Sequence, residues 1–271
     1  MIYKTIQNEK VPTFGLGTWL LNGQECTDGV AHALDIGYRH IDTAQGYDNE
    51  AEVGAGLEHS NVARDDIFLT TKLKPSNFHR DAVLRTTDES LRKLGTDYVD
   101  LMLLHWPNPS VPLEETLTAL RELQDQGRVR HIGVSNFPPS MVSEAQQYAT
   151  IFSNQVEYHP YLTQDKLREQ AQQDDYLLTA YSPIARGQVF GDDTLKEIGA
   201  KYGKNEVQVT LRWLVQQDNV AAIPKAASAE HREANAAVAE FELSDDEMAR
   251  IHALNRDERL IDPADGPDWE R

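Results

Sequence analysis

Four side chains capable of acid–base chemistry end or closely follow apolar runs of the chain: Asp42, Tyr47, Lys72 and His105. A tyrosine ordinarily loses its proton near pH 10, so it needs a nearby cation to become a usable proton donor at neutral pH. Lys72 is a suitable cation, and Asp42 would hold it charged and in place. His105 can hydrogen-bond a carbonyl oxygen and stabilise negative charge that develops there. The four residues together predict proton transfer to a carbonyl group.

Each residue also has a purely structural explanation. Asp42 could cap a helix, Tyr47 could pack, Lys72 could be a satisfied charge at the end of a strand, and His105 could be a core histidine. Parallel strands bring their carboxyl ends to one face, however, so the four side chains would meet there. The sequence contains no evident protein nucleophile, metal-ligand spacing or Ser-centred elbow. The electrons must therefore come from a bound cofactor.

The elements that position these residues alternate regularly along the chain. Apolar runs predict eight strands, at 14–19, 38–42, 67–72, 98–105, 130–135, 152–157, 176–181 and 220–223. Helical patterns cover 25–36, 48–58, 80–94, 113–126, 140–148, 163–173, 194–202, 206–217, 230–238 and 244–254. Helix 48–58 should begin at the N-cap residue Asp48, and helix 244–254 at a capping box of Ser244 and Glu247. The alternation predicts an α/β fold, a (β/α)8 TIM barrel forming one domain over 1–271. An N-terminal β-hairpin at 2–11, turning at Asn8-Glu9, and a short C-terminal tail complete it.

The loops after the last two strands are the expected site of a dinucleotide. No G-x-G-x-x-G follows the first strand, so a Rossmann site is unsupported, whereas barrels bind phosphate after strands seven and eight. These loops are 181–187 and 223–228, and Tyr181 offers a flat face on which a nicotinamide ring could stack. The strand ends at 133–137 and at Gln155 offer polar side chains to its carboxamide.

Several blocks of sequence occur in the order and spacing of one known family. The blocks are 14–19, 39–50, 70–72, 103–107, 133–137, Gln155, 181–183 and 223–225, and the second contains Arg-His-Ile-Asp-Thr-Ala followed by Tyr-Asp-Asn-Glu. They span nearly the whole chain. The chain thereby resembles the aldo-keto reductase superfamily, in particular its short-loop prokaryotic members similar to 2,5-diketo-D-gluconate reductase.

This resemblance implies roles for individual residues. Asp42, Tyr47, Lys72 and His105 match the family's catalytic tetrad, Tyr181 the residue that stacks on nicotinamide, and Lys225 the lysine that meets the 2′-phosphate of NADP. The full set of expected cofactor-binding residues is Thr18, Ser135, Asn136, Gln155, Tyr181, Ser182, Pro183, Lys225, Ser228, His231 and Asn235. The expected substrate-pocket residues are Trp19, Lys74 and Trp106.

The chain also departs from the family pattern. Ala226 and His231 stand where the family often has Ser and Arg, so we expect NADP(H) to be preferred only modestly and NAD(H) to be accepted. Lys74 replaces a pocket tryptophan of many relatives. It predicts a cation at the rim that favours anionic substrates, with a solvated surface lysine as the alternative. The short segments after His105, after Tyr181 and at the C-terminus predict an open mouth.

Composition restricts the class of protein further. The formal net charge is −18 and the chain has one cysteine, which exclude nucleic-acid partners, a disulfide framework and a Cys-based metal cluster. We find no signal peptide and no membrane span, and therefore expect a soluble, cytoplasmic monomer with no metal. The acidic surface fits either an ordinary acidic bacterial enzyme or a halophilic one from a high-salt cytoplasm.

These features predict an NAD(P)H-dependent alcohol:NADP oxidoreductase that reduces small aldehydes and ketones by hydride transfer, with Tyr47 as the proton donor. The alternative is a barrel that binds the dinucleotide as a sensor, with little turnover. A complete tetrad argues against a sensor, because a sensor needs no tuned acid. A cofactor-free barrel isomerase is a third possibility, but it would not use Ser135, Asn136 and Tyr181 in this way.

Overall fold

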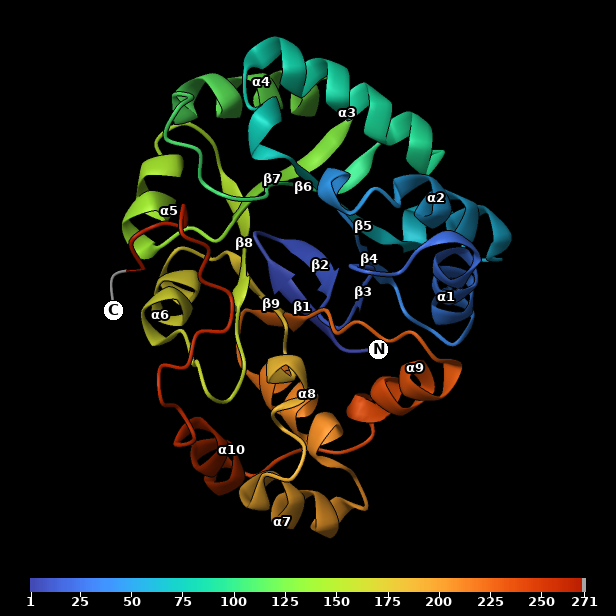
Figure 1. Cartoon of the computed structure of the whole chain (residues 1–271), viewed down its shortest axis with the longest axis vertical. Helices are drawn as coiled ribbons and strands as arrows, with labels where there is room; N and C mark the ends of the chain where they lie inside the picture. Colours follow the sequence, from blue (N-terminus) through green and yellow to red (C-terminus); the bar gives the residue numbers. More distant parts are fainter. Residues whose placement is uncertain (270–271) are drawn as a thin grey trace.

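The strands form one closed parallel sheet in the computed structural model, which describes residues 1–269 (Figure 1). The strands are β3 (Leu16–Gly17), β4 (His40–Asp42), β5 (Phe68–Leu73), β6 (Val99–Leu104), β7 (Val129–Ser135), β8 (Ile151–Glu157), β9 (Leu177–Tyr181) and β10 (Val220–Ala222). They lie side by side in chain order. A parallel bridge between Phe14 and Ala222 joins the last strand to the segment before the first. The predicted barrel is therefore confirmed.

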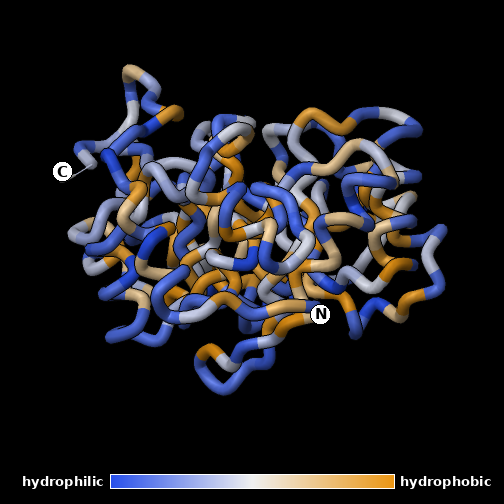
Figure 2. Tube along the Cα trace, turned by 90° about the horizontal axis from the view of Figure 1, so that it is seen from below, coloured by the Kyte–Doolittle hydropathy of each residue, from blue (hydrophilic) through white to orange (hydrophobic). Residues whose placement is uncertain are grey.

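Helices surround the sheet (Figure 1). They are α1 (Gly23–Asp35), α2 (Glu50–His59), α3 (Arg80–Leu94), α4 (Leu113–Asp125), α5 (Pro139–Ala145), α6 (Asp165–Gln173), α7 (Asp193–Tyr202), α8 (Glu206–Gln216), α9 (Ala229–Ala236) and α10 (Asp245–His252). Each longer helix turns an apolar stripe to the sheet, as Leu117, Leu120 and Leu123 do on α4. Hydrophobic stretches accordingly gather inside and hydrophilic ones outside (Figure 2). No helix within residues 1–269 is long and apolar enough to cross a bilayer.

Two predicted helix starts can be compared directly with the structure. The capping box of α10 is present, because Ser244 Oγ accepts from the Glu247 N–H and the Glu247 carboxylate accepts from the Ser244 N–H. The prediction that Asp48 caps the helix after β4 is wrong. Asp48 has a left-handed φ of 55° after a 3-10 turn at Gln45–Tyr47, and α2 begins only at Glu50. The extra turn places Tyr47 at the mouth of the barrel.

The N-terminal hairpin of β1 (Tyr3–Ile6) and β2 (Glu9–Pro12) covers the end of the barrel opposite the strand carboxyl ends. Its turn is at Gln7 and Asn8, with φ of 48° and 66°, one residue before the predicted position. Ile6 and Val11 are fully buried against side chains of the barrel interior. The hairpin therefore seals this end, which leaves the other end for chemistry.

Gly17 explains how the first strand fits against the last. A Cβ at this position would lie 2.6 Å from the Ile223 carbonyl oxygen, closer than any side chain allows. The Gly17 N–H donates to the Pro224 carbonyl at 3.1 Å. The absence of a side chain at Gly17 thus permits this close backbone approach, which draws the loop after β10 against the mouth.

Candidate active site

The four acid–base residues meet at the carboxyl end of the barrel. Asp42 ends β4, Lys72 is the second-last residue of β5, and His105 directly follows β6. The His105 N–H donates to the Leu73 carbonyl at 3.2 Å, which extends the ladder between these strands by one residue. Tyr47 ends the 3-10 turn after β4. Strand register thus brings together residues that are far apart in the sequence.

A buried ammonium group organises this cluster. Lys72 Nζ donates to Asp42 Oδ1 at 2.5 Å, to the Thr43 carbonyl at 2.8 Å and to Tyr47 Oη at 3.1 Å. These are all the hydrogen bonds that an ammonium can donate. Lys72 is fully buried, so its charge depends on these partners rather than on water. The Gln155 amide donates to the second carboxylate oxygen of Asp42 at 2.7 Å.

The phenol of Tyr47 and the imidazole of His105 face the same space. Their rings are edge-to-face with centroids 5.5 Å apart. Both line a cavity of about 510 Å³, together with Asp42, Ser135, Asn136, Gln155 and Tyr181. A carbonyl group in this cavity could contact the proton donor and the imidazole at once, which is the geometry that general acid catalysis requires.

Burial and charge set the protonation states here. Burial raises the pKa of Tyr47, and the ammonium of Lys72 opposes that rise without cancelling it. We expected the lysine to lower the pKa of Tyr47; its effect has that direction, but burial outweighs it. Burial would lower the pKa of Lys72, yet Asp42 and Tyr47 together raise it above its usual value. Burial and Lys72 lower the pKa of His105 to about 3. At neutral pH the site therefore holds a protonated phenol, a charged lysine and a neutral imidazole.

Amide and hydroxyl side chains form one wall of the cavity. Ser135 Oγ donates to the Gln155 carbonyl at 2.8 Å, and the Asn136 amide donates to the His105 carbonyl at 3.0 Å. Tyr181 Oη donates to Asn136 Oδ1 at 2.7 Å. These bonds fix the wall before any ligand binds. Because Gln155 gives its amide nitrogen to Asp42, its oxygen is what it can offer to a carboxamide.

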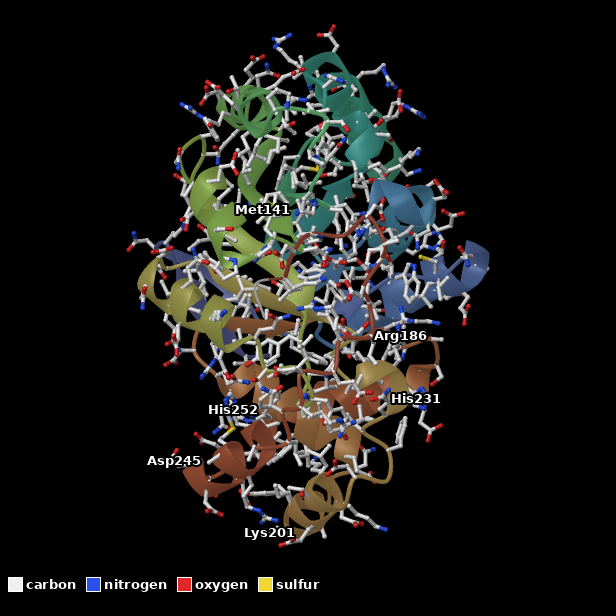
Figure 3. The ribbon with its side chains drawn as sticks, turned by 60° about the vertical axis from the view of Figure 1, so that its left-hand side comes forward. Met141, Arg186, Lys201, His231, Asp245 and His252 are labelled. Atoms are coloured by element: carbon white, nitrogen blue, oxygen red, sulfur yellow. The ribbon has the colours of Figure 1, made fainter. Side chains whose placement is uncertain are left out.

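The residues expected around a cofactor phosphate lie farther along the same face. Lys225 lines the cavity with an exposed side chain, next to the buried Pro224. Ser228 Oγ caps α9 by accepting the His231 N–H at 3.1 Å, and the His231 side chain is exposed at the edge of the molecule (Figure 3). Asn235 is buried farther along α9. Of these four residues, only Lys225 lines the cavity.

Arg232 was not predicted from the sequence, although it directly follows His231. It is 5% exposed, and its guanidinium donates to the Ala226 and Ala227 carbonyls at 3.0 and 2.6 Å. Arg232 therefore stabilises the loop after Lys225 from within. Arg232 does not substitute for the arginine that the family often has at the position of His231, because these guanidinium donors are directed inward.

The expected substrate-pocket residues divide into two groups. Trp19 and Trp106 line the cavity, as do Ser182 and Pro183 from the cofactor set. Lys74 is not among the residues that line it, and its ammonium lies 3.2 Å from Asp48 Oδ1. Thr18 is also outside the lining; its hydroxyl donates to the Asp42 carbonyl at 3.0 Å and so positions the aspartate.

Several lining residues were not named individually from the sequence, Arg186 and Ile261 among them. Arg186 comes from the loop 181–187, where a cation beside a proposed phosphate site was a usable signal. Ile261 comes from the tail after α10, and nothing in the sequence indicated it. The tail also places Trp269 against Trp106, with ring centroids 6.1 Å apart. The short tail therefore reaches the mouth that we expected to be open.

Comparisons with known proteins agree with this geometry. The model of the Aldo/keto reductase family matches residues 13–256. The chain is 41% identical over 254 residues to the glyoxal reductase of Bacillus subtilis, covering 93% of this chain and 91% of that one. It is 37% identical over 266 residues to the methylglyoxal reductase of Escherichia coli O157:H7, covering 96% and 99%. The crystal structure of a putative 2,5-diketo-D-gluconic acid reductase B superposes with a TM-score of 0.97 at 44% identity, covering 99% and 98%.

Proposed function

Since the chain belongs to the aldo/keto reductase family and reduces carbonyl compounds, we propose that Tyr47 is its proton donor and NADPH its preferred reductant. The observation that carries the assignment of Tyr47 is its contact with Lys72. Within the catalytic cavity, the phenol accepts a hydrogen bond at 3.1 Å from a buried ammonium. That bond stabilises the phenolate left behind when the proton departs.

The cavity residues suit a dinucleotide. The wall of Ser135, Asn136 and Gln155 would hold the carboxamide, Tyr181 would support the ring, and Lys225 would meet a phosphate. When bound, the nicotinamide supplies a hydride to the carbonyl carbon. The neutral imidazole of His105 hydrogen-bonds the carbonyl oxygen, and Tyr47 gives that oxygen its proton. An alkoxide is far more basic than a phenolate, so the raised pKa of Tyr47 still permits this transfer.

The proposed substrates are small dicarbonyl compounds. Two relatives are named for glyoxal and methylglyoxal, and the structural neighbour is named for a diketo acid. A cavity of about 510 Å³ suits small molecules of this kind. The sensor alternative has no comparable support, because these relatives are named reductases.

Tyr47→Phe tests the proposal. The variant keeps the ring but has no proton to give, so NADPH oxidation with methylglyoxal should fall by about 10²–10⁴. Quenching of tryptophan fluorescence by NADPH should be unchanged. Substantial residual turnover in this variant would show that Tyr47 is not the acid.

The preference for NADPH over NADH should be modest. Lys225 offers an ammonium group to a 2′-phosphate, whereas the imidazole of His231 offers fewer donors than the guanidinium of an arginine. The ratio of kcat/KM for the two cofactors should collapse in Lys225→Ala and widen in His231→Arg. A ratio indifferent to both substitutions would mean that neither residue reads the 2′-phosphate.

A further inference from the structure

Arg186 stands at the solvent side of the catalytic cavity. It lines the cavity with Tyr47 and His105, and its side chain is exposed. The guanidinium carbon lies 5.7 Å from the centroid of the Trp19 ring, which is itself 46% exposed (Figure 3 labels Arg186). This arrangement is a cation–π contact at the rim. The tryptophan holds the guanidinium over the opening without using its hydrogen-bond donors.

The turn that carries Arg186 is strained. Ala185 and Arg186 have φ of 48° and 51°, in the left-handed region that residues other than glycine rarely adopt. The turn is held by the Ala185 N–H, which donates to the Ser182 carbonyl at 2.9 Å, and by complete burial of Ala185. Strain of this kind persists where the surrounding structure enforces it, and it concentrates at functional sites.

In the described part of the chain, Arg186 lacks the acidic partner that Lys72 and Lys74 each have. Lys72 is paired with Asp42, and Lys74 lies 3.2 Å from an oxygen of Asp48. Within residues 1–269, Arg186 has no acidic partner within salt-bridge distance. A free guanidinium presents a planar fork of donors that matches a carboxylate or phosphate.

We propose that Arg186, resting on Trp19, binds the oxyanion of a carbonyl substrate, so that the enzyme favours aldehydes and ketones carrying a carboxylate or phosphate. This inference rests on the proposed reductase function. Arg186 thereby takes the role that the sequence suggested for Lys74, that of a cation at the rim that favours anionic substrates. The phosphates of the dinucleotide carry the same oxyanion chemistry, so the experiment must separate the two sources.

The test compares 4-oxobutanoate with butanal, which match in chain length but differ by one carboxylate. At saturating NADPH, Arg186→Ala should lower the ratio of their kcat/KM values by about tenfold or more, chiefly through KM for the acid. Turnover of butanal and the Kd for NADPH should stay unchanged. Arg186→Lys should recover part of the ratio. Arg85→Ala, which removes an exposed arginine from α3, is the control for net charge and should leave the ratio unchanged.

Two outcomes would overturn the proposal. If Arg186→Ala weakens NADPH binding and slows both substrates equally, the arginine serves the cofactor's phosphates. If Lys74→Ala lowers the ratio and Arg186→Ala does not, Lys74 is the selective cation. A binding measurement that does not depend on turnover separates failure of the proposed site from failure of the proposed reaction. Calorimetry measures the binding of 4-hydroxybutanoate to the complex of the enzyme with NADP. This binding should weaken about tenfold in Arg186→Ala whether or not turnover occurs, and no weakening would also refute the site.

Discussion

Lys72 and Tyr47 show how burial changes the chemistry that residue types suggest. A lysine beside a tyrosine suggests a lowered phenol pKa, but burial raises the pKa of Tyr47 and the ammonium only limits that rise. The same burial makes Lys72 dependent on Asp42, which lies 2.5 Å from it. The result is a phenol that stays protonated until a strong base appears next to it. Such a base forms only when the carbonyl oxygen becomes negative.

The alkaline limb of the pH–rate profile tests the role of Lys72. Reduction requires protonated Tyr47, so the rate falls as pH rises through the pKa of the phenol. Lys72→Met removes the group that lowers this pKa, so the limb should move to higher pH while kcat drops. The measurement is residual kcat/KM from about pH 9 upward through the limb, because the phenol pKa already lies above its ordinary value of about 10 in the wild type. Lys196→Met, on the exposed face of α7, should leave the limb in place. An unmoved limb in Lys72→Met would show that the lysine does not tune Tyr47.

The low pKa of His105 predicts the shape of the pH–rate profile on its acid side. Because its pKa is about 3, the imidazole is neutral throughout the usual assay range. The wild type should therefore show no acid limb from this residue between pH 5 and pH 8, unlike a histidine titrating near pH 6.5. His105→Gln should lower kcat/KM by about 10² without changing the shape on the acid side. A limb near pH 6.5 that disappears in the variant would mean that the charged imidazole takes part.

At the scale of elements, alternation along the sequence predicted the strands and the residues at their ends. Asp42, Lys72 and His105 could be placed together because strand register depends on local patterns. Arg186 and Ile261 could not be placed at the site in this way. The position of Arg186 depends on the path of a strained turn, and that of Ile261 depends on the path of the tail after α10. The prediction that Asp48 caps the next helix was wrong for a related reason, because a single 3-10 turn shifted the start of α2. Local pattern thus determined the catalytic centre, and loop geometry determined the rim.

A buried carboxylate helps to hold the tail after α10 against the barrel. Glu157 ends β8 and is fully buried; it accepts from the Leu260 and Ile261 N–H groups at 2.8 and 3.0 Å. His159 Nε2 lies 3.0 Å from the same carboxylate. In Figure 1 the tail runs from α10 past α6 toward α5. Since Ile261 lines the cavity, Glu157 holds part of the cavity wall in place through the tail, and we predict that it is a positioning residue.

Glu157→Gln should weaken the attachment of the tail that contributes Ile261 to the cavity wall. A glutamine has one acceptor oxygen for two N–H donors, so one donor would stay buried without a partner, at about 1–3 kcal/mol. We expect KM for carbonyl substrates to rise and trypsin to cleave faster at Arg256, with the Kd for NADPH unchanged. Leu260→Pro removes the N–H of the tail that donates to Glu157, and it should have the same effects on KM and on cleavage. Glu144→Gln, exposed at the end of α5, is the control. An unchanged KM with faster cleavage would show that the tail does not shape the pocket.

At the scale of the whole molecule, the chain must bind an anionic cofactor while carrying a net charge of −18. Only local cations can reconcile the two, and Lys225 is the lysine among the residues that line the cavity beside the loop after β10. The surrounding field repels dinucleotides at long range, so association should depend on screening. Moderate salt should therefore help the cofactor to approach and weaken the contacts that it then makes.

The same charge bears on stability, and salt tests its effect. Exposed ion pairs contribute about 0–1 kcal/mol each and weaken with salt, whereas an excess of 18 negative charges repels itself and is relieved by salt. We expect repulsion to dominate. The melting temperature should rise as KCl is raised toward about 1 M, where the Debye length falls from about 10 Å at 0.1 M to about 3 Å. For a chain of this size, each kcal/mol gained corresponds to about 2–4 °C.

The control for this experiment is sucrose at matched osmolarity, which favours compact states by exclusion from the surface and screens no charge. If repulsion is the cause, KCl should give most of its effect below about 0.5 M, where the Debye length changes fastest, and sucrose should give a smaller, linear rise. A chain adapted to a salt-rich cell should show a large KCl effect, and an ordinary acidic enzyme a slight one. A melting temperature that falls with KCl would contradict the prediction, because ion pairs would then outweigh the repulsion of the excess charge.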